Sequence, residues 1–181
     1  MKTFISLLRG INVGGHNQIK MDALREVYVS LGYSNVKSFI QSGNLIFCSE
    51  ITDSHLIEKS ISERILQSFG FKVPVLVLTI EELKSALDNN PFIKDTSKNP
   101  TFMHLTFLSE TPDSTLVDNI STNYFSPDEF DCFDKAIYLY CPAGYGNTKL
   151  NNTFFEKKLK VTATTRNLKT SLELLILAKE I

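Results

Sequence analysis

Hydrophobic positions in the first 80 residues follow the periods of strands and helices in turn. Short apolar or β-rich runs predict four strands, over residues 3–8, 36–41, 44–49 and 71–78. Hydrophobic residues three or four positions apart predict two helices, over about 21–31 and 53–69, each followed by a glycine. Gly43, between the second and third strands, suits a tight turn. The predicted order is βαββαβ.

The second half of the chain predicts the same order. Its strands are expected over residues 101–108, 129–133, 136–140 and 161–165, and its helices over about 111–120 and 152–159. A last helix carries hydrophobic residues on one side, at Leu168, Leu172, Leu175 and Ile176. Between the halves, Thr79 and Glu82 form a capping box that opens a connecting helix. We therefore expect an N-terminal subdomain over 1–80, a helix and polar linker over 81–100, and a C-terminal subdomain with the final helix over 101–181.

The order βαββαβ is that of the ferredoxin-like motif. The predicted fold class is α+β, with two ferredoxin-like subdomains that each contain an antiparallel sheet. Because a right-handed helical crossover returns the chain to the same end of the sheet, the loop after the first strand and the turn after the second share one edge. In the second half, the loop after the third strand and the end of the fourth strand share an edge for the same reason.

Polar and glycine-rich segments collect at both predicted edges, and they suit an anion. Backbone amides of glycine loops, cationic side chains and side-chain amides are typical partners of phosphate groups. We expect the two edges to approach each other and to bind a small anionic ligand, with phosphorylated compounds as one class, in a cleft between the subdomains. The candidate ligand-binding residues are Arg9, Gly10, Asn12, Gly14, Gly15, His16, Asn17, Gln41, Ser42, Gly43, Asn44, Gly146, Asn147, Lys149, Arg166 and Asn167.

A purely structural explanation exists for each of these segments. Asparagines in a glycine-rich loop often cap the local backbone, the segment 41–44 has the composition of a simple tight turn, and Asn167 suits a helix N-cap. The first loop, however, uses about ten residues where a strand-to-helix connection usually takes about two to six. Long structured loops are often functional, which favours a ligand.

Four segments, LLRGINVGG, QSGN, GYGNTKL and TTRN, resemble in order and spacing the bacterial family known as domain of unknown function 1697. The resemblance extends over essentially the whole chain. It implies a fold of two ferredoxin-like subdomains and carries no established activity. One position departs from the family pattern, because His16 stands where lysine is common. A histidine is only partly charged near neutral pH, so it is a weaker permanent cation.

Composition indicates a folded protein without a strong global field. The chain has 43% hydrophobic and 22% charged residues, and its formal net charge is −1. No apolar stretch has the roughly 18 residues that span a bilayer, so no membrane partner is expected. An odd cysteine number without a CxxC pair, and the lack of a visible export signal, favour reduced thiols in the cytoplasm.

Motifs for particular chemistries are largely absent. Gly10 to His16 resemble part of a P-loop, but His16 and Asn17 replace the lysine and the hydroxyl residue that this motif needs. No zinc spacing, HExxH or nucleophile elbow occurs, so no metal or cofactor is assigned and no catalytic residue is identified. His16 is the best candidate for acid or base chemistry. An enzyme and a binding protein both stay open.

A basic segment offers an alternative function. Six basic residues lie between 149 and 169 against one acid, namely Lys149, Lys157, Lys158, Lys160, Arg166 and Lys169. They suit either a solvated helix face or a patch that binds RNA or DNA. A protein-interaction scaffold is a third possibility, and the sequence gives no oligomeric state.

Overall fold

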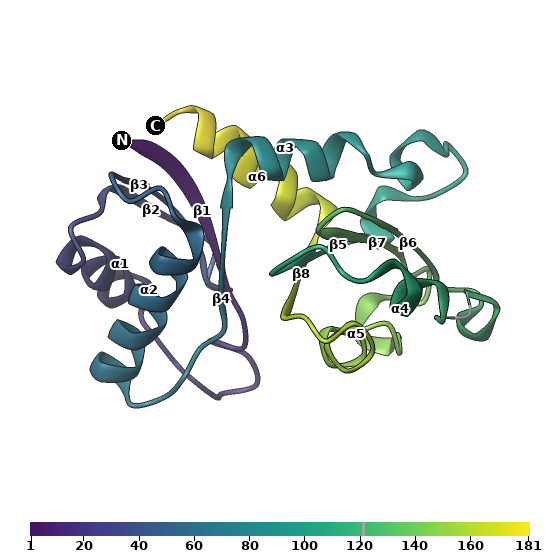
Figure 1. The fold of residues 1–181 in the computed structure, drawn as a ribbon, viewed down its shortest axis with the longest axis horizontal. Helices are drawn as coiled ribbons and strands as arrows, with labels where there is room; N and C mark the ends of the chain where they lie inside the picture. The colour runs from purple at the N-terminus through teal and green to yellow at the C-terminus, as the bar shows by residue number, and fades with distance from the viewer. Residues whose placement is uncertain (121) are drawn as a thin grey trace. The chain divides into compact units, whose positions relative to one another are not determined.

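The computed structural model describes residues 1–120 and 122–181, which fold into two compact units. Unit 1 comprises Met1–Leu83 together with Glu173–Ile181, and unit 2 comprises Lys84–Leu172. Each unit contains a four-stranded antiparallel sheet, as Figure 1 shows. The final helix is shared, because its residues up to Leu172 belong to unit 2 and those from Glu173 belong to unit 1. The order of hydrophobic residues along the chain does not indicate this division.

Unit 1 contains the predicted βαββαβ order. Its strands are β1 (Lys2–Leu8), β2 (Ser34–Phe39), β3 (Asn44–Ser49) and β4 (Val75–Thr79), and they lie in the order β2-β3-β1-β4. Helices α1 (Met21–Ser30) and α2 (Ser54–Phe69) cover one face of this sheet (Figure 1). Asp53 caps α2 by accepting from the amides of His55 and Leu56, and Gly70 ends it in a left-handed conformation.

The core of unit 1 lies between this sheet face and the two helices. Alternate side chains of β1, beginning with Phe4, point into it, and Ile57, Ile61 and Ile65 reach it from successive turns of α2. The Tyr28 hydroxyl is buried there at 2.7 Å from the Ser6 hydroxyl, so both polar groups are satisfied.

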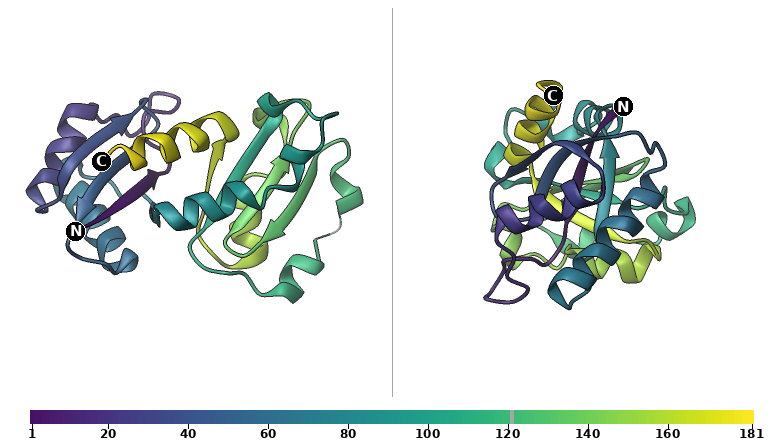
Figure 2. Two further views of the ribbon diagram at one scale, coloured as in Figure 1. Left: turned by 90° about the horizontal axis from the view of Figure 1, so that it is seen from above. Right: turned by 90° about the vertical axis from the view of Figure 1, so that its left-hand side faces the viewer.

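Unit 2 repeats the topology with shorter helices. Its strands are β5 (Met103–Leu108), β6 (Glu129–Phe133), β7 (Ala136–Tyr140) and β8 (Ala163–Asn167), in the order β6-β7-β5-β8. Its helices are α4 (Ser114–Asp118) and α5 (Asn152–Leu159), with short 3-10 turns η1 (Pro91–Lys94), η2 (Pro100–Phe102), η3 (Thr122–Phe125) and η4 (Tyr145–Asn147). Helices α4 and α5 cover one sheet face, as Figure 2 shows. Helices α3 (Ile80–Asp88) and α6 (Leu168–Lys179) each contribute residues to both units.

One polar contact recurs in the same place in both units. Glu58, the fifth residue of α2, accepts from the amide of Val77 on edge strand β4 at 2.8 Å. Glu156, the fifth residue of α5, accepts from the amide of Ala163 on edge strand β8 at 3.0 Å. Each carboxylate satisfies an edge amide that would otherwise be open to another strand. The two halves therefore share a structural device, although no repeat is visible in their sequences.

The α+β class with two ferredoxin-like units is confirmed, and the differences are local. The second and eighth strands are displaced by two residues from their expected positions, so β2 ends at Phe39 and β8 extends to Asn167. A left-handed Ile40, with φ of 50°, ends β2 early.

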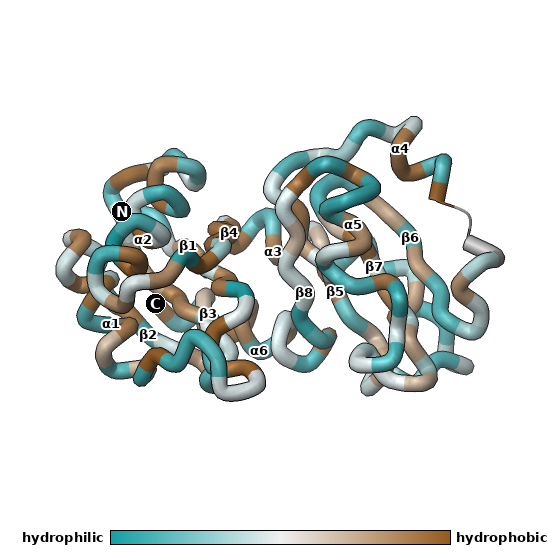
Figure 3. The backbone as a smooth tube through the Cα atoms, turned by 90° about the horizontal axis from the view of Figure 1, so that it is seen from below, coloured by the Kyte–Doolittle hydropathy of each residue, from teal (hydrophilic) through white to brown (hydrophobic). Residues whose placement is uncertain are grey.

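The capping box at the start of α3 is confirmed, with Thr79 and Glu82 each accepting from the other's amide. Hydrophobic and hydrophilic segments alternate along the helices and strands in Figure 3, as expected of elements that turn one face to a core. No helix among the described residues has the length and apolar character needed to cross a membrane.

Candidate functional site

The first candidate region, the unit 1 edge, consists of the loop 9–20 after β1 and the turn 40–43 between β2 and β3. Strands β1 and β3 are antiparallel, and Leu7 pairs with Asn44, so the end of β1 lies beside the turn. The amide of Leu8 donates to the carbonyl of Gly43 at 2.8 Å. The predicted meeting of these two segments at one edge is thus confirmed.

Asn12 organises the unit 1 edge. Its side-chain amide donates to the carbonyls of Ile19 and Gln41, at 3.0 and 2.9 Å. Its side-chain oxygen accepts from the amide of Ile19 at 2.8 Å. One asparagine therefore joins both ends of the loop and ties the loop to the turn, which is the structural role that asparagine often has.

The middle of the loop is a small hairpin rather than a flexible segment. The amide of Asn12 donates to the carbonyl of Asn17, and the Asn17 side chain donates to the carbonyl of Gly10 at 3.0 Å. At the tip, Gly14 and Gly15 have φ of 59° and 80°, and the amide of His16 donates to Val13. These angles belong to a type I′ turn, which favours glycine at both central positions.

The turn 40–43 is held by packing. A Cβ atom on Gly43 would lie 2.7 Å from the Cβ of Leu8, so only glycine fits there. The buried Asn44 side chain donates to the Phe39 carbonyl and the Ser42 hydroxyl. Gln41 is exposed, and its carbonyl accepts from Asn12.

Two kinds of candidate residue are therefore distinguished in unit 1. The side chains of Asn12, Asn17 and Asn44 bind the protein's own backbone. Gly14, Gly15 and His16 are exposed at the tip, and within the described part of the chain the amides of Gly14 and Gly15 donate to no protein group. Arg9 is half-buried at the end of β1, where its amide donates to Pro74.

The second candidate region, the unit 2 edge, consists of the loop 141–151 after β7 and the end of β8. Strands β7 and β8 both pair antiparallel with β5, so they run parallel and end at the same edge, as expected. His104, near the start of β5, lies opposite Asn167 of β8. Its ring stacks on that of Tyr145 in the loop, with 4.8 Å between the centroids and 23° between the planes.

Arg166 is the half-buried cation of the unit 2 edge. Its Nη1 donates to the carbonyl of Thr165 at 2.9 Å. Burial lowers the pKa of Arg166 to about 10, and the nearby Tyr145 hydroxyl partly opposes this decrease. A guanidinium with this pKa is still charged at neutral pH, and the Arg166 side chain is half-buried.

The remaining candidates of unit 2 have local roles or are exposed. The Asn147 side chain donates to Ala143, and Asn167 caps α6 by accepting from the amide of Thr170 at 2.7 Å. Lys149 is exposed and lies 5.9 Å from the centroid of the Tyr124 ring. Gly146 is exposed in η4.

Sequence reasoning did not select His104 or Tyr145 as site residues. Burial lowers the pKa of His104, although the carbonyl of Phe102 acts in the opposite direction, so the ring is neutral at physiological pH. The position of Tyr145 between Gly144 and Gly146 was a usable signal, since a large ring between glycines in a polar loop needs a packing partner. Among the described residues, no group of three His, Cys, Asp or Glu side chains could hold a metal ion.

Comparisons with known proteins agree with this fold. The conserved bacterial protein SP0830 from Streptococcus pneumoniae has a similar structure, with a TM-score of 0.72 and 24% sequence identity, over 97% of this chain and 98% of that one. No curated protein matches the chain. The family model described as protein of unknown function (DUF1697) matches residues 1–138, which include the whole unit 1 edge and end before the loop of the unit 2 edge. The chain belongs to this family.

Proposed function

We propose that the protein binds a small anionic ligand, with phosphate esters as the favoured class, through Arg166 at the unit 2 edge. The supporting observation is the environment of the guanidinium, because burial lowers its pKa to about 10 while leaving it charged. A half-buried guanidinium is less screened by water than an exposed one, and it can bind phosphate oxygens in a bidentate way. The neutral His104 and the hydroxyl of Tyr145 supply hydrogen-bonding groups near this cation.

The unit 1 edge supports the same ligand class by a different mechanism. Gly14 and Gly15 have consecutive left-handed conformations, which turn neighbouring amides toward one side of the chain. His16 next to them adds positive charge only when it is protonated. The expectation that both edges serve one ligand stays a prediction, which separate variants of each edge test. The geometry supports binding, and no residue is assigned a catalytic role.

Pyrophosphate is a suitable first probe, and isothermal titration calorimetry at low salt measures its binding. We expect saturable binding with a Kd below about 1 mM in the intact protein. Arg166→Met should weaken it by about tenfold or more, since a hydrogen bond to a charged group contributes about 1.5–3 kcal/mol. Arg166→Lys keeps the charge but not the planar guanidinium, so its Kd should lie between those of the unchanged protein and Arg166→Met.

The matched control removes an arginine that belongs to unit 1 and to neither edge. Arg64 lies on α2, and Arg64→Met loses the same charge and should change the Kd by less than about twofold. Arg9→Met tests the unit 1 edge separately, and a comparable loss there would support one shared ligand. Absence of saturable binding up to about 10 mM, or an equal loss in the Arg64 variant, would refute the proposal.

Binding of RNA or DNA is the alternative, and the exposed lysines of unit 2 favour it. Lys157, Lys158 and Lys160 at the end of α5 make no ion pair with any residue that the structure describes. The strand residues Phe107 and Tyr138, however, are buried, so they offer no stacking surface for bases. Nucleic-acid binding should therefore be independent of sequence and should weaken steeply with salt in a filter-binding assay.

The state of the cysteines bears on the compartment in which the protein works. The three cysteines are free thiols, and Cys48 and Cys141 are buried. Free buried thiols support a reducing compartment, and we propose the cytoplasm.

A further inference from the structure

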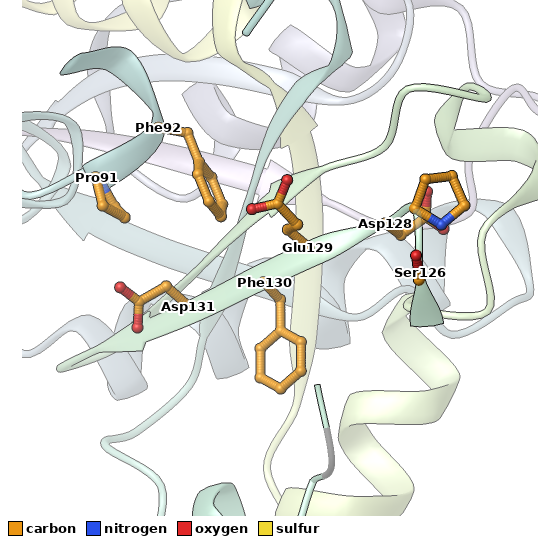
Figure 4. A pocket seen from close by; sticks show the side chains of 8 residues that line it. Pro91, Phe92, Ser126, Asp128, Glu129, Phe130 and Asp131 are labelled. Atoms are coloured by element: carbon orange, nitrogen blue, oxygen red, sulfur yellow. The ribbon is translucent and has the colours of Figure 1, made fainter. Parts of the chain in front are cut away.

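A pocket with negative lining lies in unit 2, apart from the residues that form its edge. Its volume is about 630 Å³, and its walls come from η1, the turn 126–128 and β6. Figure 4 shows Phe92 facing Glu129, with Asp131 and Asp128 on either side of Glu129 along the chain. Residues two apart in a strand point to the same face, so Glu129 and Asp131 project together about 7 Å apart. The pocket thus combines a row of carboxylates with an aromatic wall.

The chain already places one ammonium group against this wall. The Lys98 ammonium forms an ion pair with Glu129 and lies 3.9 Å from Asp95. It is 4.5 Å from the centroid of the Tyr140 ring and 5.4 Å from that of Phe92. Only 13% of the Lys98 side chain is exposed. Glu129 and Phe92, which line the pocket, therefore bind an alkylammonium through a carboxylate and an aromatic face.

Two further carboxylates of the pocket have no such cation. Asp128 and Asp131 form no ion pair with any residue that the structure describes. Their negative charge acts on buried neighbours, since Asp131 contributes to the raised pKa of Tyr138 and Asp128 to that of Cys141, after burial itself. The negative potential around these two carboxylates is therefore not neutralised by a cation from the described part of the chain.

A buried hydroxyl lies on the same side of the sheet. Tyr138 pairs directly with Asp131 across β6 and β7, so both side chains project from one face. Tyr138 is completely buried, and its hydroxyl makes no hydrogen bond with any described residue. An unsatisfied buried hydroxyl is uncommon, and this one belongs to a side chain on the same sheet face as Asp131.

We propose that this pocket binds an elongated organic polycation, a linear polyamine with primary ammonium ends. Ammonium groups would pair with Asp128 and Asp131, as Lys98 pairs with Glu129, and the methylene chain would pack on Phe92. A bound metal ion fits less well, because no three potential ligands converge among the described residues. An anion is excluded by the carboxylates. This inference is independent of the anion site at the unit 2 edge.

Isothermal titration calorimetry of spermidine binding to the full chain, at about 150 mM salt, tests the proposal. We expect one saturable site, with n-butylamine and Mg²⁺ binding much more weakly. The double variant Asp128→Asn with Asp131→Asn should lose affinity by about tenfold or more. The matched control is Asp118→Asn, an exposed carboxylate on α4 that makes no ion pair among the described residues, and it should change the affinity by less than about twofold.

A gain of affinity provides the second test, and misfolding cannot imitate it. Lys98→Met frees Glu129 from its internal partner, so spermidine should bind severalfold more tightly. Loss of binding in the double variant together with this gain would support the pocket. Equal losses in the double variant and in Asp118→Asn, or binding that disappears between about 50 and 150 mM salt, would show non-specific surface attraction and overturn the proposal.

Discussion

The substitution Gly43→Ala tests how the unit 1 edge is assembled. Gly43 has φ of 79°, and a Cβ atom there would lie 2.7 Å from the Cβ of Leu8 and 2.9 Å from Cδ1 of Ile11. The Leu8 Cβ is fixed by the backbone of β1, and Ile11 is buried, so neither atom can move away easily. Alanine should therefore suffer both backbone strain and overpacking.

Two terms set the expected size of the effect. A left-handed conformation costs a residue with a Cβ roughly 1–2 kcal/mol, and an extra methyl group in a well-packed core costs roughly 1–3 kcal/mol. The free energy of unfolding should therefore fall by roughly 2–5 kcal/mol. Gly70→Ala is the matched control, because Gly70 has φ of 81° and a Cβ atom added there would meet no atom within 4 Å. Gly70→Ala should therefore lose only the free energy that the left-handed backbone conformation costs, roughly 1–2 kcal/mol.

Urea unfolding followed by circular dichroism measures both variants. Gly43→Ala should be less stable than Gly70→Ala by roughly 1–3 kcal/mol, which is the packing term. The side-chain resonances of Leu8 and Ile11 should also shift in the folded Gly43→Ala protein. Equal stability of the two variants would refute the close approach of the turn to β1 on which the unit 1 edge depends.

Three further predictions concern polar groups described above. Asn12→Ala leaves the amide of Ile19 without its side-chain acceptor, so the free energy of unfolding in urea should fall by about 1–3 kcal/mol. The Ile19 amide should also exchange its hydrogen faster, and an unchanged exchange rate would contradict this role of Asn12. His104 should titrate below its usual pKa of about 6.5 in NMR, because burial disfavours the charged ring. Unfolded chains then bind a proton that the folded protein does not, so stability should decrease as pH falls below about 6.5, and His104→Gln should reduce this dependence. Burial raises the pKa of the Cys132 thiol to about 11, and the charges of Asp131 and Asp134 contribute to this increase. Alkylation of Cys132 by iodoacetamide at pH 8 should therefore be slow, and it should be faster in Asp131→Asn. Equal alkylation rates in the two proteins would argue against the electrostatic contribution.

Hydrophobic periodicity predicted the order of the elements well because most of them have a one-sided core face. It selected the wrong side of α6, where Leu172 and Ile176 are exposed and Leu174 and Ala178 are buried. The isoleucines of α2 at 57, 61 and 65 lie on one stripe, and all three are buried. Strand bounds were less accurate, since the end of β2 depends on the left-handed Ile40, which hydrophobicity does not reveal. The composition of the edges was also informative, because glycine and asparagine occupy the left-handed positions of the loop hairpin at Asn12, Gly14 and Asn17.

The roles of individual polar side chains were harder to predict. An asparagine that binds a ligand and one that binds its own backbone have the same sequence signature, and Asn12 is of the second kind. The ammonium-binding group of Lys98, Phe92, Glu129 and Tyr140 comes from η1, the linker and two strands. No local pattern connects these positions, because their proximity arises only from the folded sheet.

Unit 1 is built from two separate stretches of the chain, which affects the order in which it can be completed during synthesis. A ribosome makes Met1–Leu83 before unit 2, and Glu173–Ile181 after it. Leu174 and Ala178, both buried in the finished protein, are absent until then. Unit 1 therefore has all its strands early but lacks its α6 residues until late, so a nascent chain stalled anywhere in unit 2 exposes the unit 1 surface that these residues cover, and chaperones can still engage it.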